Sequence, residues 1–310
     1  SIVYMDSTKG WVPILDEDVS KPGVAPSANP TGIFGFGYSG GYKSLSNLVS
    51  SSGVVATDVS GVGTARQHPA ACEFGDDKGI FGYGYTGSVT AVTNLVSNSG
   101  VIASDVSGVG SARRGAAAAT YGGDKGIFAY GNTGSYVSMS NLVNSSGVVA
   151  SDVDGVGTAR AFLGACEFSS NKDKAIFGFG STPTAVNMTN LVTNQGVIGT
   201  DVTGVGTARN NNPAACGYGG DKGIFSYVAN IDVTNLVSNV GVVATDTTGV
   251  GSDRNGIAAT QYGNDKGIWA YGDKSGSKNI SNLISNVGVV STDVSGVGTA
   301  REELAACSWG

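Results

Sequence analysis

Six arginines, spaced 45 to 49 residues apart, are the most regular charged groups of this 310-residue chain, and an aspartate precedes each by eight residues. Guanidinium and carboxylate groups form bidentate hydrogen bonds, so the two sets predict Asp–Arg pairs that bridge neighbouring strands or blades. Six guanidinium groups gathered round one opening could instead meet an acidic ligand. We favour the structural interpretation, because a ligand site seldom needs six near-identical copies. The residues are Arg66, Arg113, Arg160, Arg209, Arg254 and Arg301, with Asp58, Asp105, Asp152, Asp201, Asp246 and Asp293.

Other reactive residue types are scarce. The one histidine, His68, has no second imidazole with which to build a metal site or a Ser/His/Asp relay. The four cysteines (Cys72, Cys166, Cys216 and Cys307) lack CxxC spacing, which argues against a zinc ribbon or a redox pair. We interpret them as small buried filler rather than as a thiolate ring for a soft metal. The sequence therefore predicts a protein that is not an enzyme and that uses no metal or other cofactor.

The composition narrows the fold and the partners. Fifty glycines and 14% charged residues indicate a β-rich chain with many tight turns. The net charge of −6 provides no basic surface for nucleic acid. No run of 18 or more apolar residues is present, so membrane insertion is not expected.

Each arginine belongs to a repeated unit of about 45 residues, which must contain the elements that position it. Four short apolar runs separated by glycine-rich breaks predict four strands per unit. Examples are AACEF from Ala70 for the first strand, KGIFGYG from Lys78 for the second, SNLVS from Ser46 for the third and GVVATDV from Gly53 for the fourth. Turn sequences such as GDDK stand between the first and second strands and predict antiparallel hairpins.

Six such units predict an all-β fold, a six-bladed β-propeller of four-stranded antiparallel blades over residues 30–310. The chain ends on AACSWG from Ala305, a first strand without a following second one, whereas the first unit opens on GIFGFG from Gly32 without a preceding first strand. We expect these two strands to pair, which would close the ring and remove an open edge. Residues 1–29 lie outside the repeat and are predicted to form an extended segment and a linker.

The order of elements within the unit resembles the kelch repeat over residues 30–310. An arginine is followed by a small-residue strand, a tight turn, an aromatic strand ending in glycine, and two further strands. Gly-aromatic-Gly replaces the paired glycines of kelch repeats, and the late tryptophan is absent. The near-identical GIFGYG and NLVSN tracts also resemble repeat proteins of bacteriophage tail fibres and other virion appendages. This resemblance implies a virion or extracellular location, with other virion or appendage proteins as partners.

Differences among the six copies concentrate after the arginine and between the second and third strands. In an up-and-down blade both connections lie on the same face, so this variable face is predicted to recognise a ligand. We expect a non-enzymatic binding module that presents it to a host-surface glycan or protein receptor, because aromatic and amide groups suit sugar rings. The candidate ligand-binding residues are Tyr38, Tyr42, His68, Tyr85, Arg114, Tyr136, Phe162 and Asn211.

Two alternatives stay open at this point. The variation could be neutral drift in exposed loops, and the chain could be a purely structural virion decoration or assembly protein with no ligand of its own. An enzyme of the kelch-type oxidase or sialidase-like kind is disfavoured, because one histidine is too few for the copper site and the Ser-x-Asp-x-Gly-x-Thr-Trp turn is missing.

Overall fold

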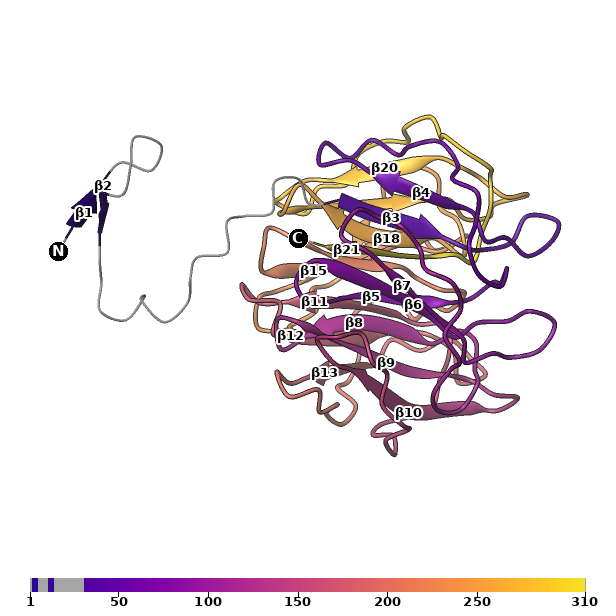
Figure 1. Ribbon diagram of the computed structural model, residues 1–310. Coiled ribbons are helices and arrows are strands. Elements are labelled where there is room, and N and C mark those ends of the chain that lie inside the picture. The colour runs from indigo at the N-terminus through magenta and orange to yellow at the C-terminus, as the bar shows by residue number, and fades with distance from the viewer. Residues whose placement is uncertain (1, 5–10, 14–30, 310) are drawn as a thin grey trace.

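The computed structural model describes residues 2–4, 11–13 and 31–309, and every regular element in them is a β-strand (Figure 1). β1 (Ile2–Tyr4) and β2 (Trp11–Pro13) pair antiparallel. Both strands lie within the segment 1–29, whereas the expected linker lies outside the described residues.

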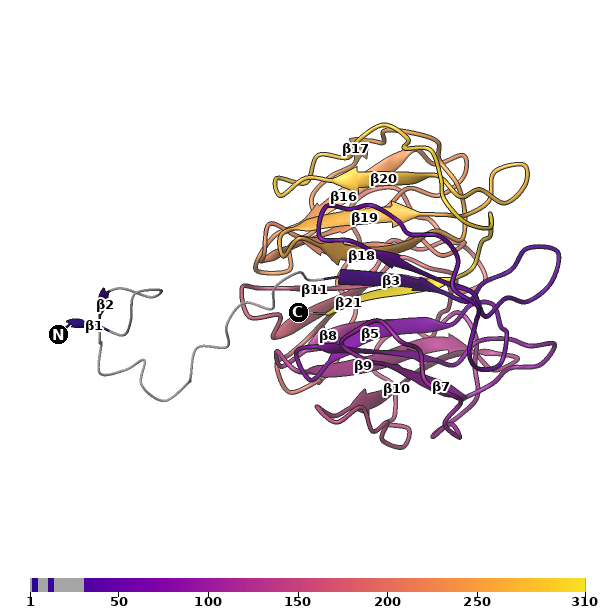
Figure 2. The ribbon, with the colours of Figure 1, turned by 45° about the horizontal axis from the view of Figure 1, so that its top comes forward.

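Residues 31–309 form six antiparallel sheets, one for each sequence unit (Figures 1 and 2). The first three strands of each unit are found where the sequence predicts them. With the one fourth strand, β17, included, the strands in sheet order are β21 (Ala305–Trp309), β3 (Thr31–Gly35) and β4 (Ser46–Val49); β5 (Ala70–Phe74), β6 (Lys78–Gly82) and β7 (Thr93–Val96); β8 (Ala117–Tyr121), β9 (Lys125–Asn132) and β10 (Tyr136–Val143); β11 (Gly164–Phe168), β12 (Lys174–Gly178) and β13 (Thr189–Val192); β14 (Ala215–Tyr218), β15 (Lys222–Phe225), β16 (Val233–Val237) and β17 (Thr247–Thr248); β18 (Ala258–Tyr262), β19 (Lys266–Ala270) and β20 (Ser281–Ile284).

The last strand completes the first sheet. β21 pairs antiparallel with β3, with Cys307 opposite Ile33, so the expected pairing of the two chain ends of the repeat is confirmed. The first strands also contact one another in sequence: β5 contacts β8, then β11, β14, β18 and β21 follow, and β21 contacts β5 again. Residues of all six line a narrow space of about 40 Å³ between them.

The predicted fourth strand is mostly absent from residues 31–309. Only the fifth sheet has one, the two-residue β17. In the first sheet the corresponding segment touches β4 at two isolated bridges, Val49 with Val55 and Ser46 with Val59. Between them the Asn47 side chain donates to the Ala56 carbonyl (2.9 Å), so an amide group replaces the backbone at that rung. The five other sheets are therefore three-stranded.

Small residues set the contact between neighbouring sheets. A Cβ added to Gly79 of β6 would lie 2.6 Å from Sγ of Cys307 in β21, and Gly126 is equally close to Cys72. The one second strand that carries alanine here, Ala175 in β12, instead packs in a cluster with Ala119 of β8. Four of these glycines therefore face a cysteine, Gly32 faces Thr260, and the alanine packs with an alanine. The cysteines are buried and free, as expected of filler, and burial raises the pKa of the Cys72 thiol.

Within the described residues, the structure has no helix long and apolar enough to cross a membrane.

Candidate functional site

The six repeated arginines do not line an opening. Each is fully buried, and all but Arg209 contact two neighbouring sheets through their side chains. Arg66 lies over the Phe36 ring of the first sheet, with 3.9 Å between Cζ and the ring centroid. On the other side its Nε donates to the Tyr83 carbonyl of the second sheet (2.9 Å) and its Nη2 to Asn94 Oδ1 (2.8 Å). Buried in this way, the arginines cannot meet an acidic ligand at the surface.

The predicted bidentate Asp–Arg pairs are wrong in detail. Asp105 accepts hydrogen bonds from the backbone N–H of Thr64 at 3.0 Å and 3.1 Å and from Asn94 Nδ2 at 2.9 Å. Asn94 Oδ1 in turn accepts a hydrogen bond from Arg66 Nη2. Direct contacts between the two sets are long, as in Arg301 with Asp58 at 3.8 Å. The aspartate that belongs to Arg66 is thus Asp105 of the following unit. It is not the aspartate eight residues earlier, because the arginine precedes the first strand of the next sheet.

The fifth sheet departs from this pattern. After β15 it has Val228 at the position where the five other units have a glycine in the left-handed region, such as Gly84 at φ 119°. A Cβ at Gly84 would lie 2.8 Å from the Gln67 carbonyl oxygen, so valine forces another backbone path. As a result Arg209 keeps a bond to the Thr207 carbonyl (3.3 Å), whereas its Nε and Nη2 have no hydrogen-bond partner in the described structure.

A closed ring of backbone hydrogen bonds joins the segments that follow the six arginines. The His68 N–H donates to the Glu303 carbonyl (2.7 Å), and the Glu303 N–H donates to Gly256 (2.9 Å). The remaining bonds are Gly115 N–H to His68, Phe162 N–H to Gly115, Asn212 N–H to Phe162, and Gly256 N–H to Asn211. His68, Phe162 and Glu303 adopt φ of 51° to 57°, values that glycine tolerates best. Two of the six copies have glycine at this position. In the other copies, the larger side chains hold the left-handed conformation at a cost of about 1–2 kcal/mol each.

A cavity of about 460 Å³ lies within this ring, and we call it the central cavity. Its walls come from the variable tracts of the repeat. Four of the eight predicted ligand-binding residues line it: His68, Arg114, Phe162 and Asn211. The other lining residues are Gln67, Asn212, Asn255, Gly256, Asp273, Glu302 and Glu303.

His68 lies in a relay of hydrogen bonds at the cavity wall. Asn212 Nδ2 donates to His68 Nδ1 (2.9 Å), which leaves the imidazole proton on Nε2. Nε2 then donates to Glu303 Oε2, 3.1 Å away. The Phe162 ring meets the imidazole edge to face, with 5.1 Å between centroids. The side chains of Asn212, His68 and Glu303 are therefore held in one orientation.

The electrostatics of this relay favour a neutral imidazole. Burial, reinforced by Arg114, lowers the pKa of His68 to about 3. Burial raises the pKa of Glu303 to about 7, and Glu302 adds to that shift, while Arg114 opposes it. Near neutral pH, the group that exchanges its proton is thus the carboxyl group of Glu303.

Three of the predicted tyrosines form a group beside the cavity. Tyr38 and Tyr42 meet edge to face with 5.9 Å between centroids, and Tyr42 meets Tyr85 at 6.2 Å. The Arg114 guanidinium lies 4.8 Å from the Tyr85 centroid and also lines the cavity, so it connects the two. Tyr136 hydrogen-bonds Ser181 instead (3.2 Å), and no ring contact joins it to the other three among the described residues.

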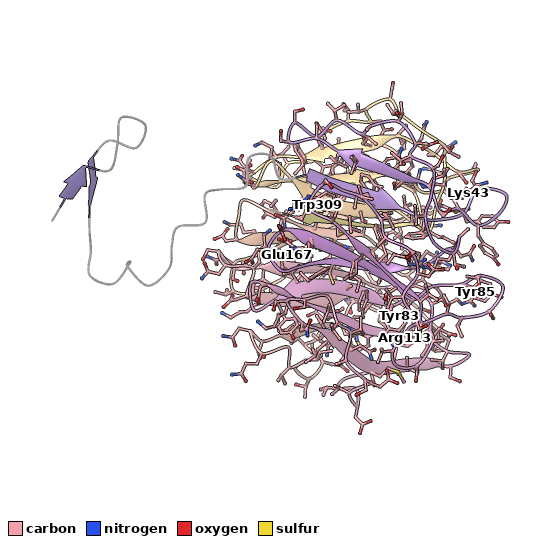
Figure 3. The ribbon with its side chains drawn as sticks, in the orientation of Figure 1. Lys43, Tyr83, Tyr85, Arg113, Glu167 and Trp309 are labelled. Carbon is pink, nitrogen blue, oxygen red and sulfur yellow. The ribbon has the colours of Figure 1, made fainter. Side chains whose placement is uncertain are left out.

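The opposite end of the molecule is filled by the chain itself. Figure 3 shows Tyr85 and Lys43 at the loop end and Glu167 and Trp309 at the other. Lys172, from the insertion at 169–173, places its ammonium 2.8 Å from Glu73 Oε2, and Gln261 donates to Glu167 beside it. Burial raises the pKa of Glu73 to about 7, while Lys172 opposes the shift.

Sequence reasoning missed several cavity residues, above all Asn212 and Glu303. Both stand in the variable tract after an arginine, NNNP and EEL, and Glu303 occupies the same repeat position as His68 and Phe162. This shared repeat position was the sequence signal that could have identified Glu303 as a cavity residue. Within the described residues, no group of three or more His, Cys, Asp or Glu side chains could hold a metal ion.

Comparison of the sequence with known proteins finds no matching family model and no matching curated protein.

Proposed function

We propose that the chain is a six-bladed, kelch-like β-propeller that binds a glycan at its central cavity and catalyses no reaction. The circuit of contacts among the six first strands and the ring of six backbone hydrogen bonds support the propeller. The proposal extends to a virion or other extracellular appendage, with a host-surface glycan as ligand, and there its support is the resemblance of the repeat tracts.

One observation carries the binding role: the cavity is built from the residues that differ among the copies. Bridges such as Gln67 with Tyr85 and Tyr38 with Glu302 join the two variable connections, which supports a single variable face. A volume of about 460 Å³ lies in the range of small-molecule sites. Tyr38, Tyr42 and Tyr85 supply aromatic faces on which the C–H groups of sugars stack.

A glycan array probed with the full chain tests this function. Saturable binding to a defined subset of glycans is expected, with loss of about tenfold or more in affinity for Tyr85→Ala and Phe162→Ala. Tyr85→Phe retains the ring and serves as the matched control, with affinity close to that of the wild-type protein. Absence of saturable binding by the wild-type chain would refute a glycan ligand.

A purely structural role is the second candidate, and the exposed valines favour it. Each of the six units exposes three valines on the segment after its third strand, for example Val54, Val59 and Val62. Where such side chains lie together as one patch, they mark a surface that docks other proteins. Failure on the array would leave this role standing.

A further inference from the structure

The charged groups of the central cavity are mainly acidic. Asp273, Glu302 and Glu303 line it, and Arg114 is the one lysine or arginine among its lining residues in the described structure. The Arg114 guanidinium lies over the Tyr85 ring. The cavity therefore presents several carboxylates with little compensating positive charge.

We propose that the central cavity recognises the ammonium group of an amino sugar, which Glu303 binds while Phe162 and the amide side chains contact the sugar ring. This inference rests on the proposed glycan-binding function and names the class of glycan. An ammonium group is a three-donor cation, and its hydrogen bonds to a carboxylate are stronger than those between neutral groups.

Glu303 is held ready for such a contact. Its Oε2 accepts a hydrogen bond from His68 Nε2–H, and His68 is held by Asn212 and by its ring contact with Phe162. The side chain of Glu303 is 27% exposed and lines the cavity, so a ligand in the cavity can contact it. A carboxylate whose orientation is fixed loses little conformational entropy on binding.

The other end of the molecule shows the same chemistry completed from within. There the ammonium of Lys172 sits 2.8 Å from the buried Glu73 carboxylate, near Glu167. The chain thus supplies its own cation to the carboxylates at one end. At the central cavity no lysine among the described lining residues does so, and a ligand would supply the cation.

Titration behaviour agrees with this geometry. Burial raises the pKa of Glu302, with Asp273 adding to the shift, and burial with Glu302 raises that of Glu303 to about 7. The groups that face Glu303 are His68, Glu302, Asp273 and Arg114. A bound cation would stabilise the ionised carboxylates, so binding should release a proton near pH 7.

His68 provides the reporter, because it is the one histidine of the chain and gives a single set of imidazole NMR signals. The full chain is titrated at pH 7 with glucosamine, with glucose and with Nα-acetyl-lysine amide. Glucosamine should shift the His68 signals and bind at least about fivefold more tightly than glucose, the gain expected of a charge-assisted hydrogen bond. Glu303→Gln should abolish that preference, whereas Asp76→Asn, in the exposed turn between β5 and β6, should retain it.

Each remaining outcome is decisive. Equal binding of glucose and glucosamine would overturn the ammonium inference and leave the glycan-binding function intact. Binding of neither sugar, together with failure on the glycan array, would overturn both. Binding of the lysine amide in place of glucosamine would overturn the amino sugar and point to a peptide ligand. If Glu303→Gln does not fold, Asp273→Asn tests the same loss of preference.

Discussion

Replacing Gly79 by alanine should destabilise the protein, although alanine is normally the better residue in a strand. The added Cβ would lie 2.6 Å from Cys307 Sγ, closer than real side-chain contacts allow, whereas its next neighbour, Val96 Cβ, lies at 3.4 Å. Overpacking of this kind costs about 1–3 kcal/mol. The sulfur atom is the obstacle, so the cost should depend on the residue at position 307.

The double variant Gly79→Ala/Cys307→Ala tests that dependence. Cys307→Ala alone removes one buried atom and should cost about 1 kcal/mol. Together the two changes reproduce the alanine pair that the third and fourth sheets already use, Ala119 and Ala175. We expect the double variant to lie within about 1 kcal/mol of the wild-type protein, which corresponds to a favourable coupling free energy of about 1–3 kcal/mol.

Urea unfolding followed by tryptophan fluorescence measures all four proteins of this cycle. If the two single effects add within about 0.5 kcal/mol, the packing argument is refuted. The converse change, Ala119→Cys, supplies an independent check, because it should place a sulfur atom against Ala175 and destabilise the protein.

Four further predictions concern the arginines, the acidic groups and the closing strand. Arg113→Met leaves Tyr130 O and Asn141 Oδ1 without their donor and should lower the free energy of unfolding by about 3–5 kcal/mol. Arg209 already lacks partners for Nε and Nη2, so Arg209→Met should cost less than half as much in the same urea assay. Burial alone would raise the pKa of Asp58, but hydrogen bonds from Thr299 and Asn47 hold that pKa below its usual value of 3.8. The stability that Asp58 contributes is therefore present above pH 3.8 and is lost as pH falls through the folded pKa. The urea midpoint should drop below pH 4, and Asp58→Asn should reduce this drop. Glu303 behaves oppositely. Its pKa is raised from 4.5 to about 7, so the stability of the protein should decline as pH rises through that interval. If Glu303→Gln shows the same pH profile of stability as the wild-type protein, Glu303 is not the group responsible. Deleting residues 305–310 removes the partner of β3 and should lower Tm by about 10 °C or more or cause self-association; a monomer of unchanged Tm would show that the closing strand is dispensable.

The strands were predictable because hydrophobic periodicity and the glycine-rich turns that interrupt it are set by neighbouring residues in the sequence. Apolar runs bounded by glycine located the first three strands of every unit, and the incomplete units at the two chain ends predicted the pairing of β21 with β3. The fourth strand failed because GVVATDV has strand-like composition, while the third strand presents Asn47. That side chain bonds both Ala56 and Asp58 and takes the place of a backbone rung. Nothing in the fourth segment itself reveals this.

The Asp–Arg error has a similar origin. Asp58 and Arg66 are near in sequence, but the sheet boundary falls between them, so Asp58 faces Arg301 and Arg66 faces Asp105. Closeness along the chain predicts contact only within one sheet. Closeness along the chain could not predict the contact of His68 with Glu303 either, since it joins the first and last units through the closed ring of backbone hydrogen bonds; only their shared repeat position pointed to it.

That ring also explains why the central cavity can vary without loss of the fold. The hydrogen bonds use backbone N–H and carbonyl groups alone, so they require a left-handed conformation at each position and no particular side chain. Glycine at 115 and 256 satisfies them as well as His68 or Phe162 does. The fold therefore does not require particular side chains within the ring, and those side chains can differ among the copies. A ligand would reach them from the variable face, because Lys172 and Glu73 fill the opposite end.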